Sequence, residues 1–301
     1  MSQLKLIIKT EYLTDVRAKS FWISTFIVPV LMVVFGIFVG LMMKDSESLT
    51  KFGELASMQD SSEEMSGRQV LGMMVGLGLT MFLMMYGAQI FNKVKVEKTN
   101  RIVEVLATCV TGRTMMLAKI ISVGLVGLTQ MILWGLLIFA MIAVVMIFAP
   151  FSIPWGELFT WSSLLDLFWI VAFFLGGYIF YGSLFAAVGA MTDKNNENQE
   201  YVSIITFVLL GSFYIGMYAV DNGAAFFTSF CSYLPFTSAT VATVNAITRA
   251  VPVWHSLLQL IVLWIFALAS MRFAGKIYTS SLLLKGKRFS PRDIVTFLKS
   301  K

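Results

Sequence analysis

The sequence predicts an all-α, polytopic membrane protein with about six transmembrane helices and both termini in the cytoplasm. Of its 301 residues, 57% are hydrophobic and only 13% are charged, whereas soluble domains are about one quarter charged. Apolar runs long enough to cross the hydrocarbon core recur along the chain. A water-soluble fold of this size could not bury so much apolar surface, so we expect the lipid bilayer to be its first partner.

Six apolar segments have the length of membrane spans. The predicted transmembrane helices cover residues 21–43, 70–91, 119–149, 163–191, 201–220 and 255–275. We expect the first to be a retained span, because no small-residue cleavage site follows it. The third is too long for an upright crossing, so we expect it to tilt or to begin in the cytoplasm. It ends before Pro150, where proline breaks the helical hydrogen-bond ladder. Residues 1–301 then form a single transmembrane domain.

A shorter apolar segment at 236–251 could be a seventh span or a re-entrant helix. The distribution of basic residues decides between them. With six spans and the N-terminus inside, 19 of the 23 lysine and arginine residues face the cytoplasm, leaving only Lys44, Lys51, Arg68 and Arg249 outside. Seven spans would export the strongly basic C-terminal tail. We therefore expect residues 236–251 to enter the membrane from outside and to return.

The sequence lacks the residue patterns that ATP-phosphate, zinc and disulfide sites require. The sequence has no G-x-x-x-x-G-K-[ST] loop for ATP phosphates and no H-E-x-x-H motif. His255 is the single histidine, so a zinc site has little material. Cys109 and Cys231 are expected on opposite sides of the bilayer and predict no disulfide. We therefore expect this chain to bind no cofactor and no metal. We also expect it to bind no nucleic acid, because its basic residues flank membrane spans.

Few ionisable residues fall within the predicted spans, which argues against a proton relay. Polar side chains in and beside the spans are instead candidates either for a substrate pathway or for helix packing. These candidates are Gln130, Tyr178, Tyr181, Tyr214 and Arg249.

The segment that follows the second span predicts an amphipathic helix on the inner membrane surface. When residues 97–113 are read as a helix, Glu97, Arg101 and Glu104 fall at i, i+4 and i+7 on one face, beside an apolar flank. A helix that only lies on a membrane favours basic residues with few acidic ones. The two carboxylates therefore suggest a protein partner that carries basic groups. A solvated connector is the alternative.

The same stretch resembles a known family. Glu97-Lys-Thr-Asn-Arg-Ile-Val-Glu104-Val-Leu106, followed by Leu117-Ala-Lys119, is similar to the E-x-x-x-x-R/T-x-x-E-x-L…L-x-G-K signature of type-2 ABC (ATP-binding cassette) exporter permeases.

Three further segments resemble the same family. Residues 234–238, followed by a short helix and Arg249, are similar to its outer re-entrant element. The tail from Lys276 is similar to that of its sodium-efflux-like branch, and residues 9–26 are similar to its amphipathic first helix and first span. The resemblance therefore covers nearly the whole chain.

The resemblance implies a permease subunit of an ATP-driven exporter in the plasma (inner) membrane. A homodimer or heterodimer of such subunits would enclose the pathway, and a separate ABC ATPase subunit would bind ATP. The implied ATPase-coupling residues are Glu97, Arg101, Glu104 and Lys119, with the glutamates contacting the ATPase and Arg101 orienting their helix. The substrate stays open among sodium, a hydrophobic drug, a peptide and a lipid-like molecule. The alternatives are a non-transporting membrane scaffold or sensor and a membrane-embedded enzyme.

Overall fold

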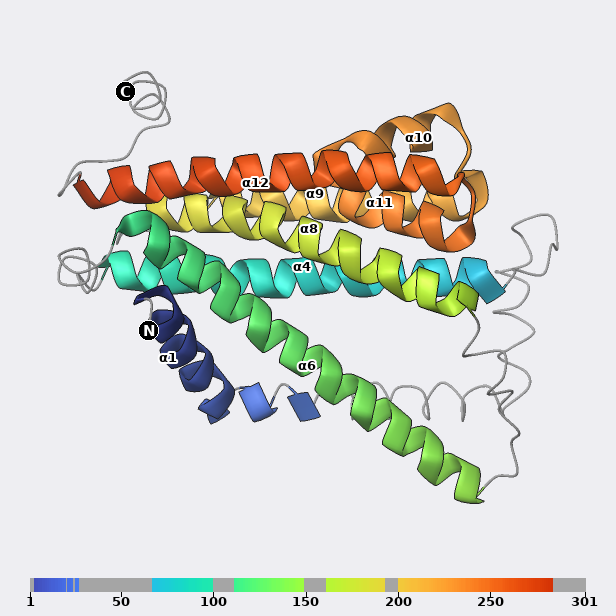
Figure 1. The fold of residues 1–301 in the computed structure, drawn as a ribbon, viewed down its shortest axis with the longest axis horizontal. Helices are drawn as coiled ribbons and strands as arrows, with labels where there is room; N and C mark the ends of the chain where they lie inside the picture. Colours follow the sequence, from blue (N-terminus) through green and yellow to red (C-terminus); the bar gives the residue numbers. More distant parts are fainter. Residues whose placement is uncertain are drawn as a thin grey trace. The chain divides into compact units, whose positions relative to one another are not determined.

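The computed structural model describes residues 3–19, 21–23, 25–26, 67–99, 111–148, 161–192 and 200–283. Within these ranges the regular structure is entirely helical (Figure 1). The helices are α1 (Gln3–Arg17), α4 (Gly67–Thr99), α6 (Gly112–Phe148), α8 (Trp161–Met191), α9 (Glu200–Asn222), α10 (Phe226–Tyr233), α11 (Pro235–Thr248) and α12 (Val253–Leu283). The predicted all-α class is confirmed.

Five of these helices have the length and composition of membrane spans. They are α4, α6, α8, α9 and α12. Each contains a candidate span of 23 to 29 residues, longer than the roughly 20 that cross the hydrocarbon core, so the chain is a polytopic membrane protein. The first predicted span, residues 21–43, lies mostly outside the described residues, so the number six stays a prediction.

The helix limits differ from the sequence prediction on both sides of the predicted helix at 97–113. The second span was expected to end at residue 91, but α4 continues to Thr99. The third was expected to begin at Lys119, but α6 begins at Gly112. Hydropathy falls at Asn92, yet no proline or glycine follows that would stop the helix. Glu97 therefore lies on the extension of the second span, while residues 100–110 fall outside the described part.

The chain divides into two compact units. The first comprises Met1–Glu11, Gly67–Leu125 and Trp155–Lys301, and the second comprises Tyr12–Ser66 and Val126–Pro154. In the second unit, the Tyr12 and Thr129 hydroxyls lie 2.9 Å apart, and the Trp134 indole donates to the carbonyl of Thr25 at 3.2 Å. These contacts join the end of α1, and the residues that follow it, to the later half of α6.

The first unit is a bundle in which α11 is the central element. This helix contacts α4, α8, α9, α10 and α12, and all its residues from Thr237 to Ile247 are buried. Its sequence is rich in alanine, serine, threonine and valine, whose small side chains let neighbouring helices approach closely. Glycines on the surrounding helices complete the fit: Gly76 on α4 faces Val244, and Gly177 on α8 faces Ala239.

Helices α10 and α11 form a hairpin that reaches only part of the way through the bundle. The N-terminal end of α11 contacts the middle of α8, where the Tyr181 hydroxyl donates to the carbonyl of Phe236. Its C-terminal end lies at the start of α4, where Arg68 donates to the carbonyl of Ile247 at 3.4 Å. At about 1.5 Å per residue, α11 is roughly 21 Å long, shorter than the hydrocarbon core.

The end of this hairpin explains why it turns back. Arg249 adopts a left-handed conformation with φ 56° and caps α11, and α12 begins a few residues later at Val253. Gly223, at the end of α9, lies so close to Ala250 that a Cβ atom would clash there. The segment predicted to re-enter, 236–251, is thus the second limb of a hairpin. The sequence analysis missed its first limb, α10.

Replacing Gly177 by alanine should loosen the contact between α8 and α11. A Cβ atom at this position would lie 2.5 Å from the Cβ of Ala239, and overpacking of this kind costs about 1–3 kcal/mol. The midpoint of thermal unfolding of the purified protein should therefore fall. Gly78→Ala is the matched control, because a Cβ there meets nothing within 4 Å. Equal stability of the two variants would contradict the close approach.

Candidate functional site: a buried ionic cluster on α1, α4 and α6

The most unusual group in the first unit is the ammonium group of Lys119. This residue lies about two turns into α6, which begins at Gly112, and is only 2% exposed. Its Nζ atom lies 3.0 Å from Glu11 Oε1 on α1 and also contacts Glu97 Oε1 on α4. A buried charge is strongly unfavourable unless it is paired and hydrogen-bonded. The two carboxylates supply that pairing, so this ammonium group holds three separate segments of the chain together.

Two further side chains complete what we call the Lys119 cluster: Glu11, Glu97, Lys119, Ser122 and Tyr278. The Ser122 hydroxyl donates to Glu11 Oε2 at 2.8 Å, so both oxygens of this carboxylate are bound. Tyr278 on α12 is buried and close enough to feel the charges of Glu97 and Glu11. Within the described part of the chain, its hydroxyl and Glu97 Oε2 have no hydrogen-bond partner.

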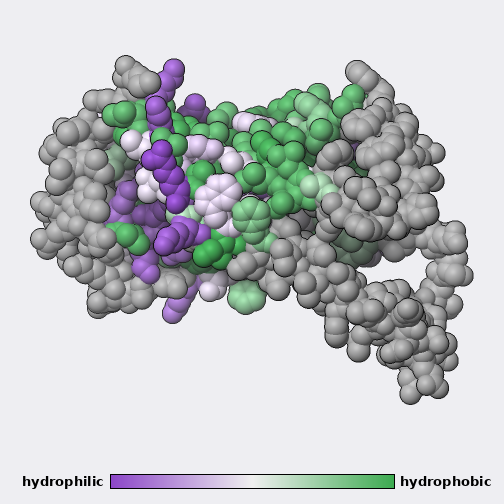
Figure 2. Space-filling view, turned by 90° about the horizontal axis from the view of Figure 1, so that it is seen from below, coloured by the Kyte–Doolittle hydropathy of each residue, from purple (hydrophilic) through white to green (hydrophobic). Residues whose placement is uncertain are grey.

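The cluster holds two carboxylates against one ammonium group, and both carboxylates are only about one fifth exposed, at 21% for Glu11 and 20% for Glu97. It lies at the end of the bundle where α4 and α12 end. Figure 2 shows that hydrophilic side chains gather toward this end and that the adjacent surface is hydrophobic. Among the described residues there is no group of three His, Cys, Asp or Glu side chains that could hold a metal ion. The ion pairs of Lys119 form an ionic joint between α1, α4 and α6.

Of the four implied coupling residues, the structure brings together Glu97 and Lys119. Arg101 and Glu104 lie outside the described residues, so their role stays a prediction. Contact of Glu97 with an ATPase also stays a prediction, and its Oε1 already binds Lys119.

Glu11 was missed by the sequence analysis. It is 108 positions from Lys119, and no local pattern connects them. The available signal was Lys119 itself, because a lysine at the start of an apolar helix needs an acidic partner.

Two of the pathway-or-packing candidates are bound to backbone groups inside the bundle. The Tyr178 hydroxyl donates to the carbonyl of Ile120 at 2.7 Å, and its ring lies against Gly124, where a Cβ would be 2.8 Å away. Tyr181 donates to the carbonyl of Phe236. Both side chains are buried and therefore fasten α8 to α6 and to α11.

The other three candidates are scattered. Gln130 is buried in the second unit. Tyr214 is 69% exposed on α9, and Arg249 caps α11. The structure does not gather the four candidates of the first unit at one site.

A second ion pair lies at the opposite end of the bundle. Arg68 on α4 is 3.8 Å from Asp166 on α8, and the Arg68 side chain is 38% exposed. Pairs of this length and exposure are worth little. In the structure Asp166 is buried and faces Arg68.

The chain's family follows from a comparison with known families. The profile of the ABC-2 family transporter protein matches residues 41–276. The chain therefore belongs to the ABC-2 transporter family, a family of ABC-transporter membrane permeases. This match and the five apolar helices agree on a multi-pass membrane protein.

Two relatives are uncharacterized. YhaP of Bacillus subtilis is 24% identical over 242 residues, covering 74% of this chain and 55% of that protein. MJ1024 of Methanocaldococcus jannaschii is 21% identical over 205 residues, covering 67% of this chain and 47% of that protein. The chain thus spans about half the length of the curated relatives it matches. No solved structure matches it.

Replacing Lys119 by methionine should destabilise the protein strongly. The change leaves Glu11 and Glu97 facing each other without a cation, and breaking a buried pair by removing one partner costs about 3–5 kcal/mol. Adding Glu11→Gln and Glu97→Gln to Lys119→Met removes the unpaired charges and should recover most of that loss. Thermal unfolding of the wild-type protein, the single variant and the triple variant in one detergent measures the coupling. If the single and triple variants unfolded at the same temperature, the three groups would not act as one unit.

Proposed function

We propose that this chain is the membrane-spanning subunit of an ATP-driven ABC exporter, with ATP hydrolysis in a separate ATPase subunit. The observation that carries the proposal is the family match over residues 41–276. The printed sequence supports a separate ATPase, because it contains no phosphate-binding G-x-x-x-x-G-K-[ST] loop.

The Lys119 cluster suggests how movement of an ATPase would be transmitted to the membrane helices. Residues 100–110, which include Arg101 and Glu104, connect the end of α4 to the start of α6. Lys119 and Glu97 tie these same two helices together, close to that connection. An ATPase that moved residues 100–110 would therefore move α4 and α6 as a pair. Because Glu11 binds the same ammonium group, the first part of α1 would move with them.

The pathway, in this proposal, lies between two permease subunits. The support is again the family, together with the bundle itself, whose centre is filled by α11. Its buried side chains leave no open channel to assign within the described part of one subunit. Sodium ions and hydrophobic drug-like compounds are the two substrate classes to be tested first. Uptake of each into inverted vesicles, with and without ATP, distinguishes them.

We propose that the end of the bundle bearing the Lys119 cluster faces the cytoplasm. The positive-inside rule supports this orientation, because 19 of the 23 basic residues then lie inside. Alkaline phosphatase fused to the C-terminus should be inactive in cells, whereas a green fluorescent protein fused there should fluoresce. An active phosphatase fusion would reverse the orientation. A phosphatase inserted after Glu63, in the predicted outer loop, is the matched control and should be active.

ATPase turnover that depends on this chain is the most direct test of the proposed function. An ABC ATPase from the same cell should co-purify with the tagged chain, and the complex reconstituted in vesicles should hydrolyse ATP and transport one of the two substrate classes. A purified chain that binds no ATPase, and whose neighbouring ATPases are indifferent to it, would favour a scaffold or sensor.

Charge reversal at Glu104 probes the coupling step. Glu104→Lys should abolish ATP-driven transport while the protein still inserts into the membrane, because a lysine there would repel the basic groups expected on the ATPase. Transport measured in vesicles, with insertion followed by membrane yield, checks both. Glu63→Lys, a reversal in the predicted outer loop, is the matched control and should transport normally. Normal transport by Glu104→Lys would remove this residue from the coupling surface.

A further inference from the structure

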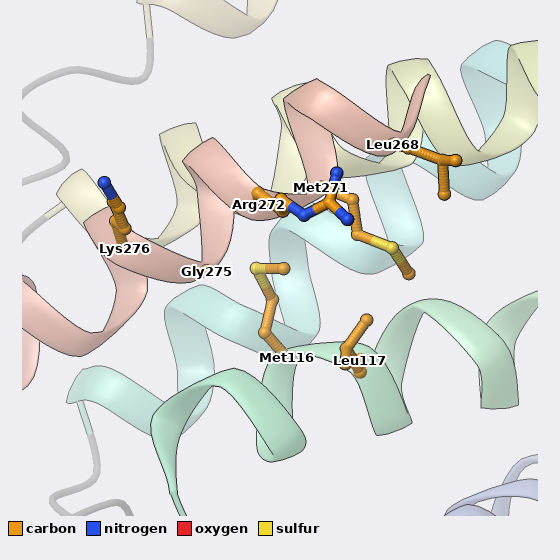
Figure 3. A pocket seen from close by; sticks show the side chains of 7 residues that line it. All are labelled: Met116, Leu117, Leu268, Met271, Arg272, Gly275 and Lys276. Atoms are coloured by element: carbon orange, nitrogen blue, oxygen red, sulfur yellow. The ribbon is translucent and has the colours of Figure 1, made fainter. Parts of the chain in front are cut away.

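The first unit contains a groove between α6 and α12 that the proposed function does not use. It has a volume of about 350 Å³ and is lined by Met116, Leu117, Leu268, Met271, Arg272, Gly275 and Lys276. Figure 3 shows the Met116 and Leu117 side chains on α6 facing those of Met271 and Leu268 on α12 across it. The volume falls within the roughly 300–1,000 Å³ of small-molecule sites.

The groove combines an apolar wall with two basic side chains. Leu268 is 44% exposed, and Arg272 and Lys276, also exposed, stand one turn apart on the same face of α12. In Figure 3 the Arg272 guanidinium group lies beside Met271, and Lys276 points outward from the rim. No acidic side chain lines the groove. Within the described part of the chain, no ion pair engages either basic group.

The depth of these basic groups matches the edge of a membrane. Counted from Val253 at the start of α12, Arg272 lies roughly 29 Å along the helix at 1.5 Å per residue. That distance is about the thickness of the hydrocarbon core. Arg272 therefore lies at the level where acyl chains meet headgroups, and Lys276 lies one turn further, among the headgroups. A long basic side chain at such a position directs its charge toward the interface.

We propose that this groove binds an anionic phospholipid from the surrounding leaflet. Arg272 and Lys276 hold the headgroup phosphate, since a guanidinium group recognises phosphate oxygens through paired hydrogen bonds and an ammonium group adds a point charge. Leu268, Met271 and Leu117 receive the first part of an acyl chain. These two cations, which form no ion pair with the described residues, select an anionic lipid over a zwitterionic one. This binding does not depend on the transport function.

Native mass spectrometry of the purified full-length chain tests the proposal. After exchange into mixed micelles of phosphatidylglycerol and phosphatidylcholine, the protein should retain phosphatidylglycerol preferentially. The double variant Arg272→Gln/Lys276→Gln should lose about tenfold or more in phosphatidylglycerol binding, since each basic group near an anionic surface contributes about 1 kcal/mol. Phosphatidylcholine adducts should not change. The exposed Arg17→Gln on α1 is the matched control, because it removes one basic group outside the groove.

Three results would overturn the proposal. Equal retention of the two lipids by the wild-type protein would show an unselective lipid surface. An equal loss in Arg17→Gln would show a general effect of net charge. Failure of a photoactivatable phosphatidylglycerol to label the peptides that contain residues 116–117 or 268–276 of the wild-type protein would place the lipid elsewhere. This labelling uses no variant, so it decides the question even if the double variant fails to fold.

Discussion

The interaction on which the described bundle most depends is the burial of a single ammonium group, that of Lys119, between two carboxylates. Three apolar side chains in place of Lys119, Glu11 and Glu97 would stabilise the helices at least as well, because burying ions costs several kcal/mol for each charge. The three ionic side chains differ from apolar ones because their contacts require a specific geometry. Lys119 must meet Glu11 and Glu97 at once, at hydrogen-bond distance, so α1, α4 and α6 have one acceptable arrangement at this end of the bundle.

The opposite end of the bundle is held together by a different kind of contact. There α11 is enclosed by α4, α8, α9 and α12, and these helices are held together by close packing instead of by ion pairs. Gly72 and Gly76 receive the side chains of Thr248 and Val244, and few charges are involved beyond the weak pair of Arg68 and Asp166. Contacts of this kind tolerate little movement, because an interior packed so closely has no free volume. The molecule thus joins a tightly packed outer half, in the proposed orientation, to an ionic joint at the cytoplasmic end.

Hydropathy and charge predicted the helical class, and the predicted spans 163–191 and 201–220 agree closely with α8 and α9, because lipid forces both the length and the composition of a crossing helix. The last span was expected to end at residue 275, but α12 continues to Leu283. The same reasoning fails where a helix leaves the apolar region. The extension of α4 to Thr99 and the start of α6 at Gly112 carry polar residues, so hydropathy places the boundary too early in one case and too late in the other. Helix α10 was missed because it is only 8 residues long. The pairing of Glu11 with Lys119 is a tertiary contact across 108 positions. A single sequence can indicate that Lys119 needs an acidic partner, but it does not identify Glu11 as that partner.

The ionic contacts of Lys119 and the close packing around α11 determine which helices would move when a partner displaces residues 100–110. The connection at residues 100–110 is bounded by α4 and α6. The ion pair of Lys119 with Glu97 ties those helices together two residues before the end of α4 and about two turns into α6. A force on the connection cannot separate the two helices without exposing a carboxylate or stranding an ammonium group, and either costs several kcal/mol. The helices therefore respond together. Since α4 also packs along α8 and α11, the displacement reaches the packed half of the bundle through α4. In the proposed coupling, Lys119 is the residue that ties these helices together. The resemblance implies that role from its position in a motif, and its ion pairs with Glu11 and Glu97 support the proposal.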